Sequence, residues 1–344
     1  MQPTSTAVIL EGPGRLAVRE IPVPPISGPS LRVALGGCGI CGSDVRYFRG
    51  ENPWAMHTLG YHVDSPPNMV LGHEVAGTRI GDGTRVAILA YRACGRCASC
   101  RAGHENLCRD MEHFGHSAGW GERDYYPGGM SRVFDIWEGF AYPIPDSISF
   151  EAATFLDGLA VAVHAVDMCR LGADSSIAIV GLGPIGMLAA QVARSLGARV
   201  SGCDTDSLPV ELARKVGLGR TDRGTATELS GDGPFDAVID TVGSEASVVT
   251  GMGLLAERGR LVMLAVHPEP VSLPLTALSG ERTLLTSANN RYRDFPRAIE
   301  LLADGTVVVE PLVTHRFPID RAHDAFATML EKDKHGAFKI VLTP

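Results

Sequence analysis

The pattern of apolar and polar positions changes near residue 151. Before that point the apolar runs are short and are separated by Gly and Pro, as is typical of β-strands joined by tight turns. These runs are Thr6–Leu10, Leu31–Leu35 and Thr84–Leu89, and the clearest Gly- and Pro-rich break is Ile21–Pro29. The pattern therefore predicts an irregular, β-rich first part of the chain.

After residue 151 longer helix-like segments alternate with short buried strands. An apolar helix is expected over Glu151–Cys169, and the alternating segments that follow are Ile177–Val180, Met187–Leu196, Val200–Cys203, Val210–Val216, Ala237–Asp240 and Leu261–Val266. Such alternation indicates βαβ units that form a parallel, doubly wound sheet with helices on both faces. The last part of the chain adds two helices, Phe295–Ala303 and Ala322–Met329, and a closing strand at Phe338–Leu342.

Composition narrows the class of protein. A length of 344 residues suggests about two domains, and 45% hydrophobic with 20% charged residues is ordinary for a globular core. The net charge is −8 and no run of Lys or Arg exceeds two residues, which argues against nucleic acid or an anionic membrane as partner. The first residues lack the features of a signal peptide, and no apolar stretch reaches about 20 residues. We therefore expect a cytoplasmic protein.

Four cysteines follow one another in a Cys-x2-Cys-x2-Cys-x7-Cys run. They are Cys94, Cys97, Cys100 and Cys108, and four thiolates on one short loop can complete a tetrahedral shell around Zn²⁺. An iron–sulfur cluster would favour a shorter last spacing followed by Pro, whereas Arg109 follows here. Disulfides would need an oxidising compartment. The spacing favours structural zinc on the loop 94–108, so the chemistry must lie elsewhere.

A glycine-rich turn follows the strand that begins at Ser176. Its residues Gly181, Gly183, Pro184, Ile185 and Gly186 belong to a G-x-G-x-x-G motif with a strand before it and a helix after it. The glycines permit the tight turn, the approach of a pyrophosphate and close helix–strand packing, while the helix N-terminus attracts the phosphates. The alternative is a tight turn without a ligand, but the context favours dinucleotide binding.

Asp204 indicates which dinucleotide the motif binds. It ends the strand Arg199–Cys203, 23 residues after Gly181, where a carboxylate can accept hydrogen bonds from the ribose hydroxyls of adenosine. A carboxylate repels a 2′-phosphate, and residues 205–209 contain no Arg or Lys to bind one. The sequence therefore predicts NAD rather than NADP.

Further possible metal ligands occur in the first part of the chain. The run Cys38-Gly-Ile-Cys41-Gly-Ser43-Asp44 is followed by His73 and Glu74, and Asp157 comes much later. Cys, His and a carboxylate are the ligands of a catalytic zinc with one exchangeable position. The C-x-x-C pair alone also fits a thiol–disulfide centre, although the βαβ unit of a thioredoxin-like centre is absent beside it.

These motifs together resemble one known family. The CGICGSD run, the GHEVAG run at Gly72–Gly77, the four-cysteine loop and GLGPIG occur in the order seen in zinc-dependent medium-chain alcohol dehydrogenases. The likeness covers the chain from about residue 6 and is greatest for the polyol branch with sorbitol and threonine dehydrogenases. It implies a Rossmann domain, a GroES-like catalytic domain and a structural zinc lobe. The implied boundaries are 1–157 and 295–344 for the catalytic domain and 158–294 for the NAD-binding domain.

The resemblance also assigns roles to individual residues. It implies a catalytic zinc on Cys41, His73 and Asp157, with Glu74 as an adjacent or alternating ligand, and proton uptake by Ser43. Tyr47, Arg291 and Tyr292 fall at positions that face a polyol substrate, and Lys339 at a basic position near the cofactor phosphates. The alternatives are a surface salt bridge for Arg291 and a solvated position on a strand edge for Lys339.

The predicted function is hydride transfer between NAD and a secondary alcohol of a polyol, sugar or cyclitol. Alternatives are an amino-alcohol dehydrogenase and a zinc- and dinucleotide-binding protein without turnover. The resemblance implies a homo-oligomer, dimer or tetramer, paired through an edge strand that we expect near Arg260–Val266.

The chain departs from the family pattern in two places. Arg46 stands where many relatives have a His, and because Arg keeps its proton we expect proton exit through the cofactor ribose, His57 or His62. The 31 residues between Cys41 and His73 predict an enlarged loop. The stretch His113–Gly129 also looks expanded, and His113 and His116 receive no role.

Overall fold

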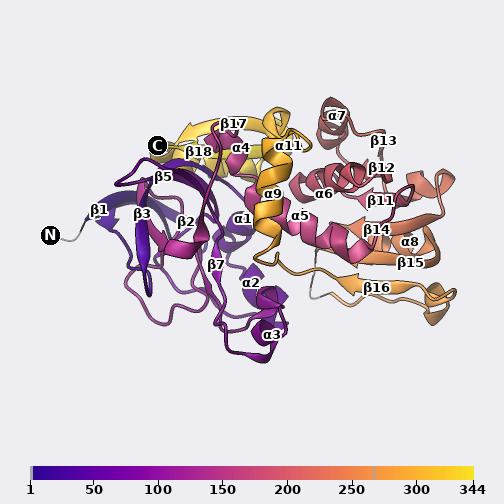
Figure 1. Ribbon diagram of the computed structural model, residues 1–344, viewed down its shortest axis with the longest axis horizontal. Helices are drawn as coiled ribbons and strands as arrows, with labels where there is room; N and C mark the ends of the chain where they lie inside the picture. Colours follow the sequence, from indigo (N-terminus) through magenta and orange to yellow (C-terminus); the bar gives the residue numbers. More distant parts are fainter. Residues whose placement is uncertain (1–2, 266, 268) are drawn as a thin grey trace. The chain divides into compact units, whose positions relative to one another are not determined.

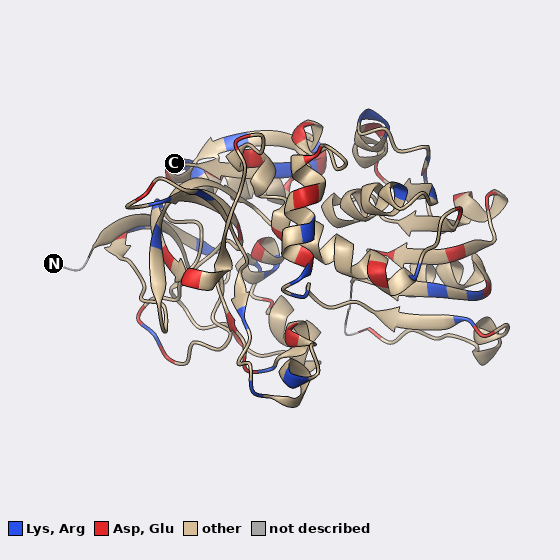
Figure 2. Ribbon diagram, viewed as in Figure 1, with Lys and Arg blue, Asp and Glu red and all other residues tan. Residues whose placement is uncertain are grey.

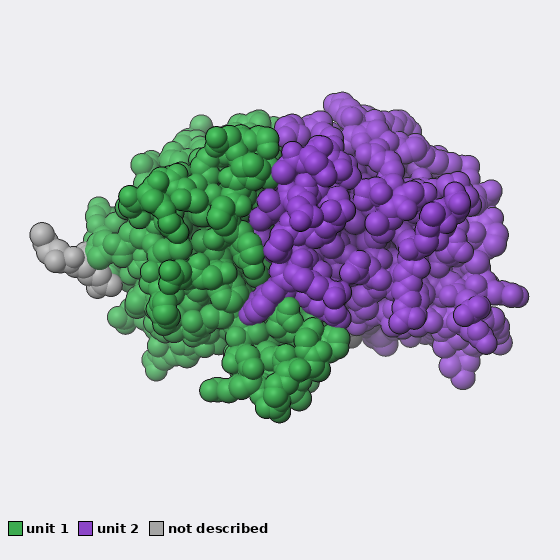
Figure 3. All heavy atoms as spheres, viewed as in Figure 1, with its two compact units in different colours: residues 1–157, 313–344 green, residues 158–312 purple. Residues whose placement is uncertain are grey.

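The computed structural model describes residues 3–265, 267 and 269–344. The chain forms two compact units (Figure 3), one of Met1–Asp157 with Val313–Pro344 and the other of Gly158–Leu312. The first unit is therefore built from two separate pieces of the chain.

The first unit is β-rich (Figure 1), as the short apolar runs predict. Its larger sheet has the order β10-β6-β5-β3-β18-β17, with β9 paired to β3, and a smaller sheet has the order β2-β1-β4. The strands are β1 Thr4–Gly12, β2 Arg15–Pro22, β3 Ser30–Gly39, β4 Met69–Val70, β5 Glu74–Arg79, β6 Arg85–Ile88, β7 Tyr91–Arg92, β8 Glu112–His113, β9 Val133–Trp137, β10 Ala141–Pro143, β17 Val313–Pro318 and β18 Lys339–Thr343. The core of this unit includes Ile40, Leu71, Phe114 and Ile340, which are fully buried.

Short helices connect these strands. They are α1 Gly42–Phe48, α2 Pro53–Leu59, α3 Ala98–Arg101, α4 Phe150–Ala153, α10 Ala322–Leu330 and α11 Lys332–His335. The expected enlarged loop between Cys41 and His73 thus contains a helix, α2. Its Asn52 cap accepts a hydrogen bond from the backbone N–H of Ala55, and Pro53 fits the first turn because it has no N–H to leave unpaired.

The second unit contains the predicted parallel sheet. Its order is β13-β12-β11-β14-β15-β16, so β11 lies in the middle and the order reverses between β11 and β14. The strands are β11 Ser176–Val180, β12 Arg199–Asp204, β13 Arg220–Arg223, β14 Phe235–Asp240, β15 Leu255–Met263 and β16 Thr283–Thr286, and the helices are α5 Leu156–Cys169, α6 Pro184–Ser195, α7 Ser207–Lys215, α8 Glu245–Gly253 and α9 Asp294–Ala303. Every residue of β11 is buried, as expected for a strand covered on both faces.

Three sequence expectations about the elements need correction. The expected helix Glu151–Cys169 is two helices, α4 and α5, separated by a turn at Thr154 and Phe155 where the Thr154 hydroxyl donates to the Glu151 carbonyl. The expected strand Leu261–Val266 begins earlier, at Leu255, and Val266 lies outside the described residues. The chain returns to the first unit at Val313 rather than at residue 295.

Hydrogen bonds within the second unit explain why the chain stays in that unit until Leu312. The side-chain amide of Gln191 on α6 donates to the Val308 carbonyl at 3.1 Å and accepts from the Val308 N–H at 2.9 Å. Gln191 is fully buried, so these bonds hold the segment after α9 to the second unit.

We predict that Gln191→Leu lowers the free energy of unfolding by about 1–3 kcal/mol, because two backbone groups lose their partner. Urea unfolding followed by circular dichroism measures the change. As a control, Arg297→Ala removes an exposed ion pair with Glu300 and should cost less than about 1 kcal/mol. Equal effects of the two changes would contradict the role given to Gln191.

Candidate active site

The four cysteines of the 94–108 loop converge. Their sulfur atoms all lie within 4.8 Å of one another, with Cys97 and Cys100 at 3.4 Å and Cys94 and Cys100 at 4.0 Å, and all four are free thiols. The Cys97 N–H donates to Cys94 Sγ at 3.4 Å, and backbone N–H donors of this kind lower the pKa of the Cys94 thiol to about 6. Four converging sulfurs with backbone donors fit a closed, tetrahedral zinc site.

A buried carboxylate organises the second predicted site. Asp44 in the first turn of α1 accepts hydrogen bonds from the Cys41 N–H at 2.9 Å and the Gly72 N–H at 3.3 Å. Its Oδ1 also lies 3.7 Å from Nδ1 of His73. Asp44 therefore links the loop that carries Cys41 to the residues that begin the GHEVAG run. Sequence reasoning gave Asp44 no role, although its place three residues after a helix cap is a recognisable signal.

Cys41, Ser43 and His73 lie together. His73 Nε2 is 3.3 Å from the Ser43 hydroxyl, and Cys41 is among the groups whose charge acts on the imidazole. Burial alone would lower the pKa of His73, but the Asp44 carboxylate and the Cys41 thiol outweigh it and raise the pKa well above the ordinary value. The imidazole is thus surrounded by anionic groups.

Asp157 lies in the first turn of α5, directly after the break that separates α4 from α5. Burial raises the pKa of its carboxyl to about 6, although the charge of His73 partly opposes this shift. A neighbouring cation would stabilise the ionised carboxylate, as zinc does for its ligands.

Glu74 and Lys339 form a buried ion pair in the same unit. The Lys339 ammonium donates to Glu74 Oε2 and lies 5.0 Å from the centre of the Phe155 ring. Burial lowers the pKa of Lys339, but the Glu74 charge outweighs it and the net shift is upward. The expected alternative of a solvated strand-edge lysine is wrong, because β18 lies between β3 and β17 and Lys339 is 2% exposed.

The donor set of this site fits a divalent cation. Cys41, Asp44, Glu74 and Asp157 supply acidic groups, while His73 and Lys339 are the basic groups that interact with them. His73 Nδ1 is buried with no hydrogen-bond partner among the described residues. Of those residues, only the four-cysteine loop has all its ligand atoms within 4.8 Å of one another, so Cys41, His73 and Asp157 do not converge to that extent. The chemistry of the three side chains nevertheless suits zinc.

Aromatic rings pack beside His73. The His113 ring meets it edge-on at 5.9 Å, and His113 stacks on His116 at 3.9 Å. Burial lowers the pKa of His113 to about 3 and that of His116 well below its ordinary value, so both rings are neutral. The stretch 113–129 is therefore not an ordinary surface loop, since His116 and Trp120 are each only 5% exposed.

Tyr47, a predicted substrate contact, belongs to the same group of rings. It is 2% exposed, stacks on His116 at 5.3 Å and donates its hydroxyl to Asn52 Oδ1 at 3.3 Å. Its contact with substrate stays a prediction.

The glycine motif of the second unit has room for a ligand. Gly181 has φ of +88°, and a Cβ on Gly186 would lie 2.0 Å from the Gly181 carbonyl oxygen, so both positions require glycine. A Cβ on Gly183 would meet nothing within 4 Å, which leaves the backbone open where α6 begins with Pro184 and Ile185. An open backbone at a helix N-terminus is suited to a pyrophosphate.

Asp204 at the end of β12 is held in place by the same turn. Its Oδ2 accepts from the Leu182 N–H at 2.7 Å, and its Oδ1 accepts from the Asp206 N–H at 3.0 Å. Arg223 pairs in register with Asp204 on the neighbouring strand β13, and its guanidinium donates to the Thr205 carbonyl at 3.2 Å. Sequence reasoning considered only residues 205–209 and missed this arginine, which strand pairing brings alongside.

Arg291 and Tyr292 lie between β16 and α9 in the second unit. The Arg291 N–H donates to Asp294 Oδ2 at 2.7 Å, and Asp294 lies 3.3 Å from Nδ1 of His164, so the backbone here is anchored. Both side chains are partly exposed. Their contact with substrate stays a prediction.

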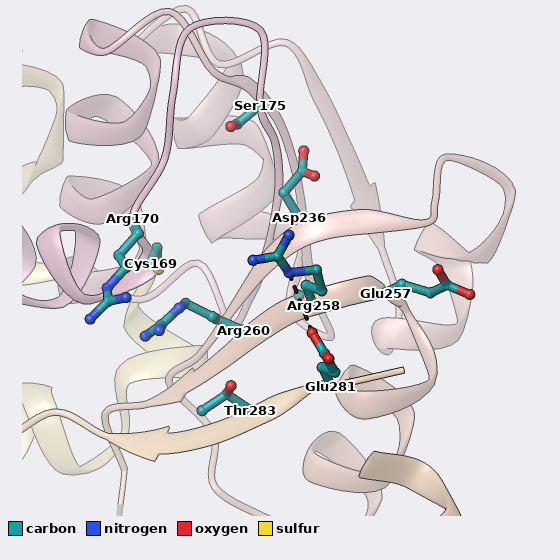
Figure 4. A pocket seen from close by; sticks show the side chains of 10 residues that line it. Cys169, Arg170, Ser175, Asp236, Glu257, Arg258, Arg260, Glu281 and Thr283 are labelled. Carbon is teal, nitrogen blue, oxygen red and sulfur yellow. Dashed lines mark ion pairs between the residues drawn. The ribbon is translucent and has the colours of Figure 1, made fainter. Parts of the chain in front are cut away.

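A cavity of about 460 Å³ opens at the end of the parallel sheet opposite to the glycine turn (Figure 4). Ser175, Asp236 and Thr283 line it near the amino ends of β11, β14 and β16, and Arg258 forms an ion pair with Glu281 beside it. Dinucleotides bind at the carboxyl ends of such strands. This cavity is therefore separate from the predicted cofactor site.

Comparison with known proteins identifies the family. Residues 29–146 match the model of the alcohol dehydrogenase GroES-like domain, and residues 184–304 match that of zinc-binding dehydrogenases. Sorbitol dehydrogenase of Mus musculus is 30% identical, over 94% of this chain and 92% of the relative. The structure of L-idonate 5-dehydrogenase from Escherichia coli superimposes with a TM-score of 0.87 at 27% identity, covering 100% of this chain and 99% of that one. The structure of a zinc-binding dehydrogenase from Sinorhizobium meliloti bound to NADP superimposes with a TM-score of 0.86 at 29% identity, covering 100% of both chains.

The chain belongs to the zinc-binding dehydrogenases of the alcohol dehydrogenase family. The fold class and the class of enzyme predicted from the sequence are thereby confirmed. Figure 2 shows basic and acidic residues interspersed along both units. Across the residues that the structure describes, no helix has the length and apolar character needed to span a bilayer.

We predict that Cys97→Ser lowers the zinc content from about two ions per chain to about one, because a four-cysteine site needs all its thiolates. Zinc is measured by atomic absorption on purified protein. As a control, Cys203→Ser changes a buried cysteine of the second unit and should leave the zinc content unchanged. Full zinc occupancy in the Cys97 variant would refute a metal on this loop.

Proposed function

We propose that the protein oxidises a secondary alcohol of a polyol, sugar or cyclitol with NAD, and reduces the corresponding ketone in reverse. The single observation that supports this most is the partly buried group of Cys41, Ser43 and His73, whose imidazole also interacts with the charge of Asp157, in a chain whose relatives include a sorbitol dehydrogenase and an L-idonate 5-dehydrogenase. We assign the catalytic residues to the first unit and the cofactor to the second.

The residues have separate tasks in this reaction. Zinc held by Cys41, His73 and Asp157 would supply Lewis-acid polarisation of the alcohol oxygen. Ser43, 3.3 Å from His73 Nε2, accepts the alcohol proton through a hydrogen bond and releases its own hydroxyl proton to the next group of the relay. The alcohol carbon then loses hydride to NAD, so one alcohol and one NAD give one ketone, one NADH and one proton. We keep Glu74 as a proposed alternating ligand, and to bind the metal its carboxylate would have to leave the Lys339 ammonium.

The proton leaves Ser43 by another route than Arg46. Arg46 is ion-paired with Glu51 at 2.6 Å, and a guanidinium keeps its proton. His62 lies 3.1 Å from Asp64 with a 53% exposed side chain, which supports exchange with solvent. His57 on α2, or the cofactor ribose, remains the alternative route.

Compartment and assembly are part of the proposal. All eight cysteines are free thiols, which supports a reducing, cytoplasmic environment.

A homo-oligomer would use an exposed sheet edge, and here the earlier expectation of Arg260–Val266 is wrong. Arg260 lies in β15, which pairs with β14 and β16, so the two edge strands of the described sheet are β13, Arg220–Arg223, and β16, Thr283–Thr286. For a dimer or a tetramer we propose that the contact passes through β16, the edge strand next to β15, which contains the start of the expected segment.

The function is tested by following NADH absorbance with polyols, cyclitols, secondary monoalcohols and amino alcohols as substrates. We predict that the polyols or cyclitols are oxidised and that His73→Ala lowers kcat/KM by at least about 1,000-fold, because one of three metal ligands is lost. His335→Ala, at an exposed position on α11, is the control and should be as active as the parent. Preferential turnover of amino alcohols would replace the proposed substrate class. Absence of turnover with every alcohol would refute the function.

We infer that NAD is preferred over NADP because Asp204 occupies the position that binds the adenosine ribose. Asp204→Ala should reduce the preference for NAD by roughly 10–100-fold, since a charged acceptor is worth about 1.5–3 kcal/mol. The ratio of kcat/KM with the two cofactors measures the effect. Asp222→Ala, a change on β13 that keeps Asp204, is the control. NADP used as well as NAD by the parent would show that Arg223, rather than Asp204, determines the choice.

A further inference from the structure

Two histidines outside the proposed catalytic set form a stacked pair next to it. We name His113 and His116 the histidine stack, because their ring centres lie 3.9 Å apart at an angle of 23°. The His113 ring touches His73, and Tyr47 and Trp54 pack against His116 at 5.3 and 6.3 Å. The stack is thus held on one side by a proposed metal ligand and on the other by two aromatic rings.

The backbone determines which ring nitrogen carries the proton in each neutral imidazole. His113 Nδ1 lies 2.9 Å from the carbonyl oxygen of Phe114, which can only accept, so Nδ1 of His113 carries the proton. His116 Nδ1 receives the N–H of Ala118 at 3.2 Å, so it must be unprotonated. The two rings are therefore opposite tautomers, and His113 Nε2 is an acceptor while His116 Nε2 is a donor.

Both Nε2 atoms are available to a ligand. Neither Nε2 atom has a hydrogen-bond partner among the described residues. Neither is fully buried, unlike the unpartnered polar atoms of the interior. Each Nε2 atom therefore keeps some solvent-accessible surface, although the His116 residue as a whole is only 5% exposed. By contrast, Trp54 Nε1 is buried without a partner among those residues, a costly arrangement that a bound oxygen atom would relieve. The group offers one acceptor and up to two donors beside His73.

We propose that the histidine stack and Trp54 form a subsite that recognises the hydroxyl group adjacent to the reacting alcohol. The substrate hydroxyl donates to His113 Nε2, and its oxygen accepts from His116 Nε2–H or from Trp54 Nε1–H. A hydroxyl group is both donor and acceptor, so it satisfies the pair, whereas a methylene group satisfies neither. The inference rests on the proposed function and narrows its substrate class to vicinal diols.

Butane-2,3-diol and butan-2-ol are the matched probes, because they differ in the one neighbouring hydroxyl. We expect the parent to have a kcat/KM for the diol at least about 10-fold above that for the monoalcohol, since a site built for a hydroxyl leaves its polar groups unpaired when the hydroxyl is missing. His116→Phe keeps a ring but removes the donor, and it should lower kcat/KM for the diol about 10-fold, chiefly through KM, with a change below about twofold for butan-2-ol.

Three further variants complete the test. His116→Gln retains an N–H donor and should recover part of the diol preference, and Trp54→Phe should weaken it in the same direction as His116→Phe. His335→Phe makes the same substitution at an exposed site and should change neither substrate. Circular dichroism and zinc content of every variant show whether it folds as the parent does.

The outcomes separate the subsite from the function. A parent that oxidises both alcohols equally well, or a His116→Phe variant that slows both to the same extent, overturns the subsite and leaves the dehydrogenase intact. A parent that oxidises neither alcohol, nor any polyol in the substrate screen, refutes the proposed function and the subsite together. A selective loss of diol turnover supports both.

Discussion

The Asp44 carboxylate is the interaction on which the first site depends. It is completely buried, yet it accepts hydrogen bonds from the backbone of Cys41 and of Gly72 and lies beside His73. A buried carboxylate is stable only when such partners replace water. The same bonds hold together two loops that are distant in sequence. They therefore position the Cys41 thiol relative to the His73 imidazole. Orientation of metal ligands by a second layer of hydrogen bonds is the usual way in which proteins prepare a metal site.

Features that depend on neighbouring residues could be predicted from the sequence. The four-cysteine loop and the glycine turn are each formed by residues close together in the chain, and spacing alone indicates their geometry. The parallel sheet also followed from alternation of strands and helices. The break between α4 and α5 was missed because four of the five residues from Ala152 to Leu156 are apolar, and a single Thr154 among them is compatible with a continuous helix.

Features that depend on pairing across the fold were not predictable. Arg223 lies beside Asp204 because β13 pairs with β12, and no local pattern in either strand gives that register. The burial of Lys339 follows from the insertion of β18 between β3 and β17, while its sequence context suggested an exposed edge. The histidine stack likewise needs the turn at Phe114–Ala118, which sets both tautomers through backbone groups. Such contacts are properties of the tertiary structure.

The two-piece construction of the first unit has a consequence for the order of folding. Glu74 and Lys339 are separated by 265 positions, and the whole of Gly158–Leu312 lies between the two pieces. During translation the nucleotide-binding unit leaves the ribosome complete and can fold while the other unit still lacks β17 and β18. Until those strands arrive, Glu74 has no ammonium partner and the central strand β3 has an open neighbour position. A chaperone would therefore be most useful while the first unit is incomplete, because it could cover the unpaired edge of β3 until β17 and β18 are made.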